Sequence, residues 1–161
     1  MGARTRTPHW PRGLRFLRLP PTKQCLSFSW IKWIKLTEYR KAVTPDAQYK
    51  SLYVEMKSNE YRNFKKIYTD GSKSANGVGS AAVTATTSCP ATLPKEASIF
   101  TAEVHALKMA VDSIQRTGST ENVIFTDSRS AIEALHSKSH HPVILYIYHQ
   151  LHKFQLNNIR V

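Results

Sequence analysis

The chain has 161 residues, of which 41% are hydrophobic and 21% are charged, so it has room for one ordinary globular domain and an attached segment. Lysine and arginine outnumber the acids 23 to 11, and the net charge of +12 makes nucleic acid a natural first hypothesis for a partner. No run of 18 apolar residues occurs, and Cys25 and Cys89 lack the spacing of a zinc site or a disulfide framework. Composition therefore argues against a membrane span and against a disulfide-linked partner.

Residues 1–43 are expected to form a basic, disordered extension. Residues 1–60 hold 12 basic and 4 acidic side chains, so most of the excess charge lies in the first part of the chain. The first 37 residues contain no acid, which is also compatible with an organellar transit peptide. However, an amphipathic helix there would be broken by Pro8, Pro11, Pro20 and Pro21. The few cysteines fit a reducing, intracellular compartment, which the sequence does not specify further.

Residues 44–62 are predicted to contain a lead-in helix and a linker. Thr44, Pro45 and Asp46 combine a hydroxyl cap, a proline in the first turn and an acid near the positive helix end. Apolar and aromatic residues then recur at helical spacing: Tyr49, Leu52, Tyr53 and Met56. These signals predict a helix over about 45–58.

Strands are predicted to follow. Residues 66–70 and 78–86 have strand character and are separated by a turn-rich stretch, which predicts a β-hairpin. A third strand is expected over 97–100, after a loop that contains Pro90 and Pro94.

The second half alternates helices with strands. A helix over 101–116 is predicted from the stripe Val104, Leu107, Val111 and Ile114, and Gly118 is expected to end it. Residues 122–127 have the apolar character of a central buried strand, and 128–136 form a short helix. Pro142 begins another helix with Ile144, Ile147, Leu151 and Phe154 on one face, and 158–161 begin one more strand. This order predicts an α/β domain with a mixed five-stranded sheet over residues 63–161.

Three acids are expected to converge because each lies where a strand or helix would direct it to one place. Asp70 is near the end of the first strand, Glu103 is placed in the first turn of the main helix, and Asp127 ends the central strand. Three adjacent carboxylates raise one another's pKa, so such clusters normally bind divalent cations. Oxygen ligands favour Mg²⁺ or Mn²⁺, and two such ions suit phosphodiester hydrolysis.

Each acid also has a plainer interpretation. Asp70 with Gly71 is typical of turns, Glu103 suits a helix dipole, and Asp127 with Ser128 is typical of a helix cap.

Three stretches together resemble a known family. Tyr68-Thr69-Asp70-Gly71-Ser72, Thr101 to Leu107 and Phe125-Thr126-Asp127-Ser128 are similar to the first three acidic motifs of type 1 ribonuclease H, in order and spacing. The resemblance covers about residues 44–161 and is greatest to the ribonuclease H domains of non-LTR retrotransposon polyproteins, which also carry reverse transcriptase. Gly77-Val78-Gly79 adds to it.

The resemblance implies a ribonuclease H-like fold, with helices on both faces of the sheet, and Mg²⁺-dependent endonucleolytic hydrolysis of the RNA strand of RNA–DNA hybrids. Asp70, Glu103 and Asp127 would be the catalytic metal ligands, in a two-ion mechanism that Mn²⁺ can also support. Ser72 and Asn76 would lie at the substrate hybrid. Family members read the hybrid by sugar and shape rather than by base sequence.

The chain departs from the family at its end. A loop histidine and a fourth catalytic aspartate on a last helix would follow Val161, so the domain is expected to be truncated with its last helix missing. The alternatives are a weak or inactive hybrid-binding retroelement fragment, and a non-enzymatic basic nucleic-acid-binding protein whose tryptophans stack on bases: Trp10, Trp30 and Trp33.

Overall fold

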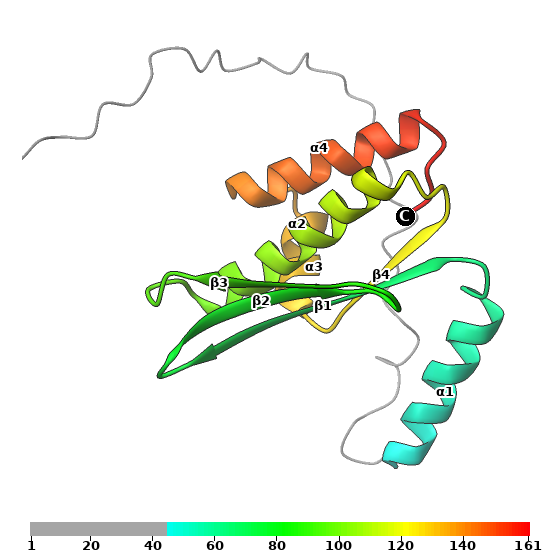
Figure 1. Ribbon diagram of the computed structural model, residues 1–161, viewed down its shortest axis with the longest axis horizontal. Helices are drawn as coiled ribbons and strands as arrows, with labels where there is room; N and C mark the ends of the chain where they lie inside the picture. Colours follow the sequence, from blue (N-terminus) through cyan, green and yellow to red (C-terminus); the bar gives the residue numbers. More distant parts are fainter. Residues whose placement is uncertain (1–44) are drawn as a thin grey trace, which may run out of the picture.

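The computed structural model of the protein describes residues 45–161, and Figure 1 shows their arrangement. The predicted extension over 1–43 lies outside the described residues, so the division of the chain at residues 44 and 63 stays a prediction. Eight elements follow in chain order: α1 (Asp46–Asn59), β1 (Lys65–Ser74), β2 (Gly77–Val83), β3 (Ser88–Leu93), α2 (Ile99–Thr117), β4 (Asn122–Thr126), α3 (Arg129–His136) and α4 (Pro142–Leu156).

The four strands form one mixed sheet in the order β3-β2-β1-β4. The β1–β2 and β2–β3 pairs are antiparallel, whereas β1 and β4 are parallel, with Thr69 opposite Thr126. An antiparallel meander is thus extended by a strand that is reached through the crossover helix α2, as the predicted element order requires. The α/β class and the mixed sheet are confirmed.

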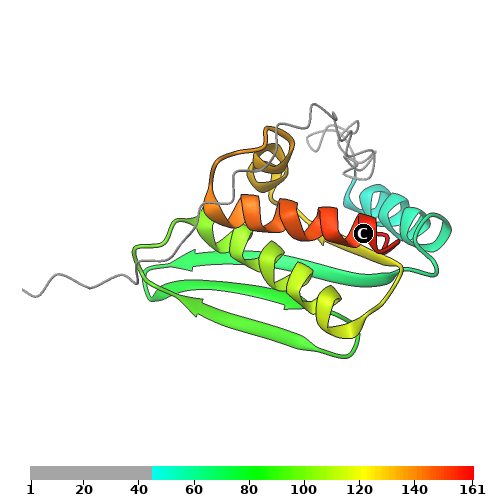
Figure 2. The ribbon, with the colours of Figure 1, turned by 90° about the horizontal axis from the view of Figure 1, so that it is seen from above.

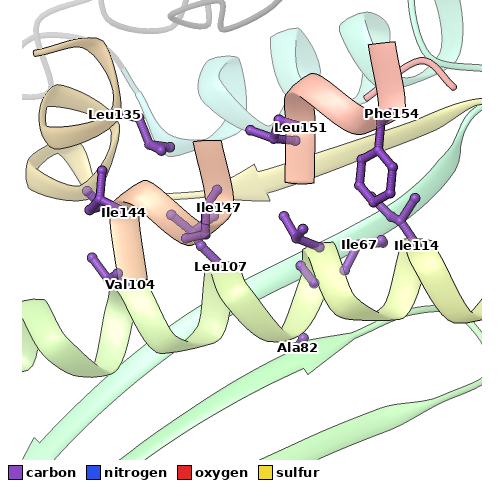
Figure 3. Packing of buried hydrophobic residues seen from close by; sticks show 13 residues of the cluster. Ile67, Ala82, Val104, Leu107, Ile114, Leu135, Ile144, Ile147, Leu151 and Phe154 are labelled. Carbon is purple, nitrogen blue, oxygen red and sulfur yellow. The ribbon is translucent and has the colours of Figure 1, made fainter. Parts of the chain in front are cut away.

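One hydrophobic core lies between the sheet and the helices α2, α3 and α4. The predicted stripes on α2 and α4 are both buried, and Figure 3 shows Leu107 of α2 facing Ile147 of α4. Ile67 of β1 and Ala82 of β2 close the core from the sheet side. Figures 1 and 2 show α2 and α4 side by side on this face, so the two predicted stripes are satisfied by each other and by the sheet.

The opposite face of the sheet carries α1. Because side chains alternate along a strand, Tyr68 points away from the core that contains Ile67. The Tyr68 ring stacks on Phe125 at 5.4 Å, and Tyr53 of α1 meets Phe125 edge-on at 5.8 Å between centroids. Figure 1 shows α1 across the sheet from α2. Helices on both faces are therefore confirmed.

The predicted third strand is wrong. Residues 97–100 are not a strand, because Ser98 caps α2 by accepting a hydrogen bond from the Thr101 backbone N–H, and the helix begins at Ile99. The third strand is β3, which includes Pro90. Within the described part of the chain β3 pairs only with β2, so Pro90 sits on a sheet edge, where the missing N–H of proline is tolerated.

The expected fifth strand reduces to a single bridge. Asn158 has a positive φ of 56°, and after this turn Arg160 pairs with Glu121 in parallel, next to the start of β4. The Arg160 N–H donates to the Thr120 carbonyl at 2.8 Å, and the Arg160 carbonyl accepts from the Asn122 N–H at 2.9 Å. The described sheet therefore has four strands, and β4 lies at one end of their order instead of at the centre.

The predicted helix boundaries agree within a few residues. Gly118 ends α2 in the left-handed conformation, with φ of 60°, where an L side chain would be strained. The Ser128 hydroxyl caps α3 by accepting from the Ala131 N–H. Among residues 45–161, no helix combines the length and the apolar character that crossing a membrane requires.

Candidate metal centre

Two of the predicted carboxylates are placed by the parallel strand pair. Asp70 lies within β1, which continues to Ser74, so its predicted place near the end of the first strand is wrong. Asp127 directly follows the last residue of β4. Because Thr69 is opposite Thr126, the next residue of each strand emerges at the same level. The Thr69 hydroxyl also donates to the Phe125 carbonyl at 3.4 Å, which joins the two strands just before the acids. The strand register thus brings Asp70 and Asp127 together.

The third carboxylate arrives because α2 passes directly over β1. A Cβ atom on Gly71 would lie 2.6 Å from the Glu103 backbone N and 2.8 Å from the Ala102 carbonyl carbon. Only a residue without a side chain permits this approach. The Gly71 backbone also hydrogen-bonds the Glu103 carboxylate. Gly71 therefore fixes the position of Glu103 beside Asp70.

The three acids form one compact cluster. One carboxylate oxygen from each of Asp70, Glu103 and Asp127 lies within 4.8 Å of the others. Asp70 and Asp127 are exposed and Glu103 is half-buried, so the cluster opens to solvent on one side. The Oε2 atom of Glu103 is buried without a hydrogen-bond partner among the described residues. Such an atom needs a partner, and a divalent cation held by carboxylate oxygens supplies one, so these residues fit Mg²⁺ or Mn²⁺.

The electrostatics of the cluster favour a cation. Burial raises the pKa of Glu103, and the negative charges of Asp127 and Asp70 raise it further, against a smaller opposing effect of the Gly71 hydrogen bond. Three carboxylates at this separation are therefore costly without a counter-charge. The arrangement can hold a divalent cation at a solvent-open edge where a phosphate oxygen could approach.

The plainer interpretations of the three acids do not fit the geometry. Asp70 is inside β1 and pairs with Ala81, so it is not a turn residue. Glu103 lies beyond the first turn of α2, which contains no acid, so its predicted place in that turn is wrong. The cap of α3 is Ser128 rather than Asp127. None of the three acids has a capping or turn role that explains its position.

The two predicted substrate contacts lie beside the cluster on the first hairpin. Ser72 is in β1, two residues beyond Asp70 and on the same face, and it is exposed. It stands opposite Gly79, where an added Cβ would contact the Ser72 hydroxyl at 3.4 Å. Asn76 is exposed in the turn, and its N–H donates to the Ser74 hydroxyl at 3.2 Å. Both residues are accessible, and their role as substrate contacts stays a prediction.

Sequence reasoning missed a second group of residues near the acids. We call Tyr53, Lys57, Tyr68 and Phe125 the aromatic–lysine cluster. The Lys57 ammonium lies 5.9 Å from the Tyr53 ring centroid and 5.7 Å from that of Tyr68. Burial alone would raise the pKa of Tyr68, but hydrogen bonds with Tyr53 and Lys57 lower it. The sequence signal that could have found part of this cluster is strand alternation, because Tyr68 lies two residues before Asp70 and therefore on the same face of the strand.

Replacing Glu103 by glutamine is expected to raise the melting temperature in EDTA at neutral pH. The raised pKa means that folded Glu103 binds its proton more tightly than unfolded Glu103. Its contribution to stability is therefore complete below the unfolded pKa and is lost as pH rises through the folded pKa. Glu103→Gln should flatten this dependence, and should also lose the stabilisation that Mg²⁺ gives the parent chain.

Thermal melts across acidic to neutral pH, with EDTA or Mg²⁺, test this expectation. The matched control is Glu133→Gln, since Glu133 is an exposed acid paired with Arg129 on α3. A Glu103→Gln chain that melts lower than the parent in EDTA at neutral pH would show that the carboxylate is not under repulsion.

Comparisons with known proteins give a fold likeness only. No protein-family model matches this chain, and no curated protein matches it. Ribonuclease H1 from the halophilic archaeon Halobacterium salinarum NRC-1 is 19% identical, with 57% of this chain and 76% of that chain covered and a TM-score of 0.42. The N-terminal ribonuclease H domain of a Mycobacterium tuberculosis protein, as a fusion with maltose binding protein, is 23% identical, with 60% and 77% covered and a TM-score of 0.42. Likenesses this distant do not indicate a function, which has to come from the residues of this chain.

Proposed function

We propose that this chain is a ribonuclease H that hydrolyses the RNA strand of RNA–DNA hybrids internally, with a divalent cation. The observation that carries the proposal is the convergence of one oxygen each from Asp70, Glu103 and Asp127 within 4.8 Å. Oxygen-only ligands at this separation suit the Mg²⁺ sites of phosphoryl-transfer enzymes. The order of the three motifs in the sequence supports kinship with the ribonuclease H domains of non-LTR retrotransposon polyproteins.

The three carboxylates have distinct tasks in this proposal. A bound cation supplies neutralising charge at the scissile phosphate and lowers the pKa of water. Asp70, supplied by strand β1, would hold the cation together with Glu103 and Asp127. The Gly71 backbone hydrogen bond holds the Glu103 carboxylate in its orientation. Asp127 enters from the end of β4, with the Ser128 cap fixing the turn behind it.

Recognition of the hybrid would use the exposed hairpin. Ser72 and Asn76 present a hydroxyl and an amide, which can hydrogen-bond a sugar 2′-hydroxyl or a phosphate without reading a base. The net charge of +12 supports binding to a polyanion. The proposed substrate is therefore defined by the sugars of its two strands and not by sequence.

Cleavage of matched substrates tests the proposal. The full chain is incubated with a labelled RNA–DNA hybrid, the same sequence as RNA duplex, and the same sequence as DNA duplex. We expect cleavage of the RNA strand of the hybrid alone, in Mg²⁺ or Mn²⁺ but not in EDTA. Binding of all three duplexes without cleavage would contradict the proposal and favour a non-enzymatic basic nucleic-acid-binding protein.

A further inference from the structure

We propose that α1 belongs to the nucleic-acid-binding surface, with Lys57 contacting a backbone phosphate next to the one at the carboxylates. This inference rests on the proposed function, because it assumes a polynucleotide over Asp70, Glu103 and Asp127. It adds a positioning residue from a helix that precedes the first strand and contributes no carboxylate to the cluster.

Asp70 and the aromatic–lysine cluster share one face of the sheet. Tyr68 precedes Asp70 by two residues in β1. Phe125 of β4 likewise precedes Asp127, the residue that follows β4, by two residues. Two residues along a strand span about 7 Å, and side chains of the same parity share a face. A duplex strand advances about 3.4 Å per nucleotide. A strand with its scissile phosphate at Asp70 would thus place a neighbouring phosphate near Tyr68 within about two nucleotides.

Lys57 is a cation at this place, and it hydrogen-bonds the Tyr68 side chain. Its ammonium lies over the rings of Tyr53 and Tyr68, and among residues 45–161 it forms no ion pair with a carboxylate. Lys66, the other nearby lysine, is already occupied by the carbonyls of Arg62 and Phe64, at 3.3 Å and 3.2 Å. A lysine held by aromatic rings keeps its charge and loses part of its freedom, which suits it to bind an anion.

The partner chemistry follows from what surrounds the ammonium. Tyrosine hydroxyls and a lysine offer donors to a phosphate oxygen, and no acid belongs to the aromatic–lysine cluster. On the other side of Asp70 along β1, Ser72 offers a hydroxyl. The face therefore presents donors on both sides of the carboxylates, as a backbone running along β1 would need.

Binding and cleavage by matched lysine variants test the inference. Lys57→Met keeps an unbranched apolar stem over the rings and removes the charge, and Lys57→Arg keeps the charge. Lys50→Met is the control, because Lys50 is an exposed lysine on the same helix. Affinity for the labelled hybrid is measured by anisotropy across salt concentrations, with Asp70→Asn present in every chain to prevent cleavage.

We expect Lys57→Met to raise Kd about fivefold and to reduce the slope of log Kd against log salt by about one, with Lys57→Arg near the parent and Lys50→Met unchanged. In chains with Asp70 intact, Lys57→Met should raise KM with kcat preserved. A melting temperature close to the parent's would show that the fold is retained.

Two results overturn the inference. One is a Lys57→Met chain that binds with the parent's affinity and salt slope. The other is a Lys57→Met chain that melts far below the parent while its slope of log Kd against log salt equals the parent's. Lys57 would then have only a structural role. A failure of the proposed function would give a different result. If the parent chain binds the hybrid through Lys57 but does not cleave it, the phosphate contact is supported and the proposed nuclease activity is contradicted.

Discussion

Replacing Asp70 by asparagine is expected to reduce cleavage of an RNA–DNA hybrid by about a hundredfold or more, equivalent to at least about 2.7 kcal/mol of activation barrier. The amide keeps the shape of the side chain but removes the charge that binds a cation. One oxygen of Asp70 lies within 4.8 Å of oxygens from Glu103 and Asp127. Asp70 is therefore the ligand that strand β1 supplies to the proposed metal site. Initial rates in Mg²⁺ and Mn²⁺ measure the loss.

The same substitution should not destabilise the chain in EDTA. Asp70 is exposed, and its charge raises the pKa of Glu103, so removing the charge relieves repulsion within the cluster. The melting temperature in EDTA is therefore expected to equal or exceed the parent's, while the gain on adding Mg²⁺ is reduced. Loss of activity together with retained stability separates a metal ligand from a structural residue.

Glu133→Gln provides the control for this measurement. Glu133 pairs with Arg129 at 2.7 Å on the surface of α3, and exposed pairs of this kind contribute little to stability. Its replacement should leave both the cleavage rate and the Mg²⁺ effect unchanged. An Asp70→Asn chain that cleaves the hybrid at the rate of Glu133→Gln would remove Asp70 from the active site and, with it, the proposed triad.

The convergence of the acids could be predicted from sequence because it depends on strand ends. A run that reads as a strand, followed at once by an acid, places that acid at the edge of the sheet whichever neighbour the strand has. Asp127 needed only this rule, and the apolar stripe of α2 placed Glu103 on the neighbouring helix. Asp70 lies inside β1, which continues to Ser74, and it meets Asp127 because Thr69 is opposite Thr126. The core residues of α2 and α4 were predictable for a similar reason, since helical spacing specifies the buried face.

Elements defined by a single local contact were not predictable. Residues 97–100 have strand-like composition, but the Ser98 hydroxyl accepts a hydrogen bond from the Thr101 N–H, and a helix begins there. Pro90 reads as a loop residue unless the strand is known to lie on an edge. The end of the chain reads as a strand, but the turn at Asn158 leaves only Arg160 aligned with Glu121. The cap at Ser98 is a local contact that periodicity does not contain, whereas the edge position of β3 and the alignment of Arg160 with Glu121 depend on tertiary placement.

The packing of α1 on the sheet was also not predictable from the sequence. In the sequence, Tyr53 and Lys57 look like ordinary residues of a surface helix. Their contacts with Tyr68 and Phe125 can be inferred only once these two residues are known to share the face opposite α2. The register of β1 against β4 decides this, and that register is a tertiary property.

Replacing Gly71 by alanine is expected to destabilise the fold by about 2 kcal/mol or more and to abolish the Mg²⁺ effect on stability. The new Cβ would lie 2.6 Å from the Glu103 nitrogen and 2.8 Å from the Ala102 carbonyl carbon, and both atoms are backbone. Helix α2 would have to move away from β1, which opens the core and separates Glu103 from Asp70. Denaturant unfolding with and without Mg²⁺ measures both effects.

Gly77→Ala is the matched control, because it adds the same methyl group to the same hairpin. No heavy atom of the residues that the structure describes, other than the two chain neighbours, lies within 4 Å of a Cβ at Gly77, so stability should change by no more than about 0.5 kcal/mol. If Gly71→Ala were as stable as Gly77→Ala and kept its Mg²⁺ response, the close approach of α2 to β1 could not be what assembles the carboxylates. A large loss confined to Gly71 would show that one missing side chain sets the distance on which the metal centre depends.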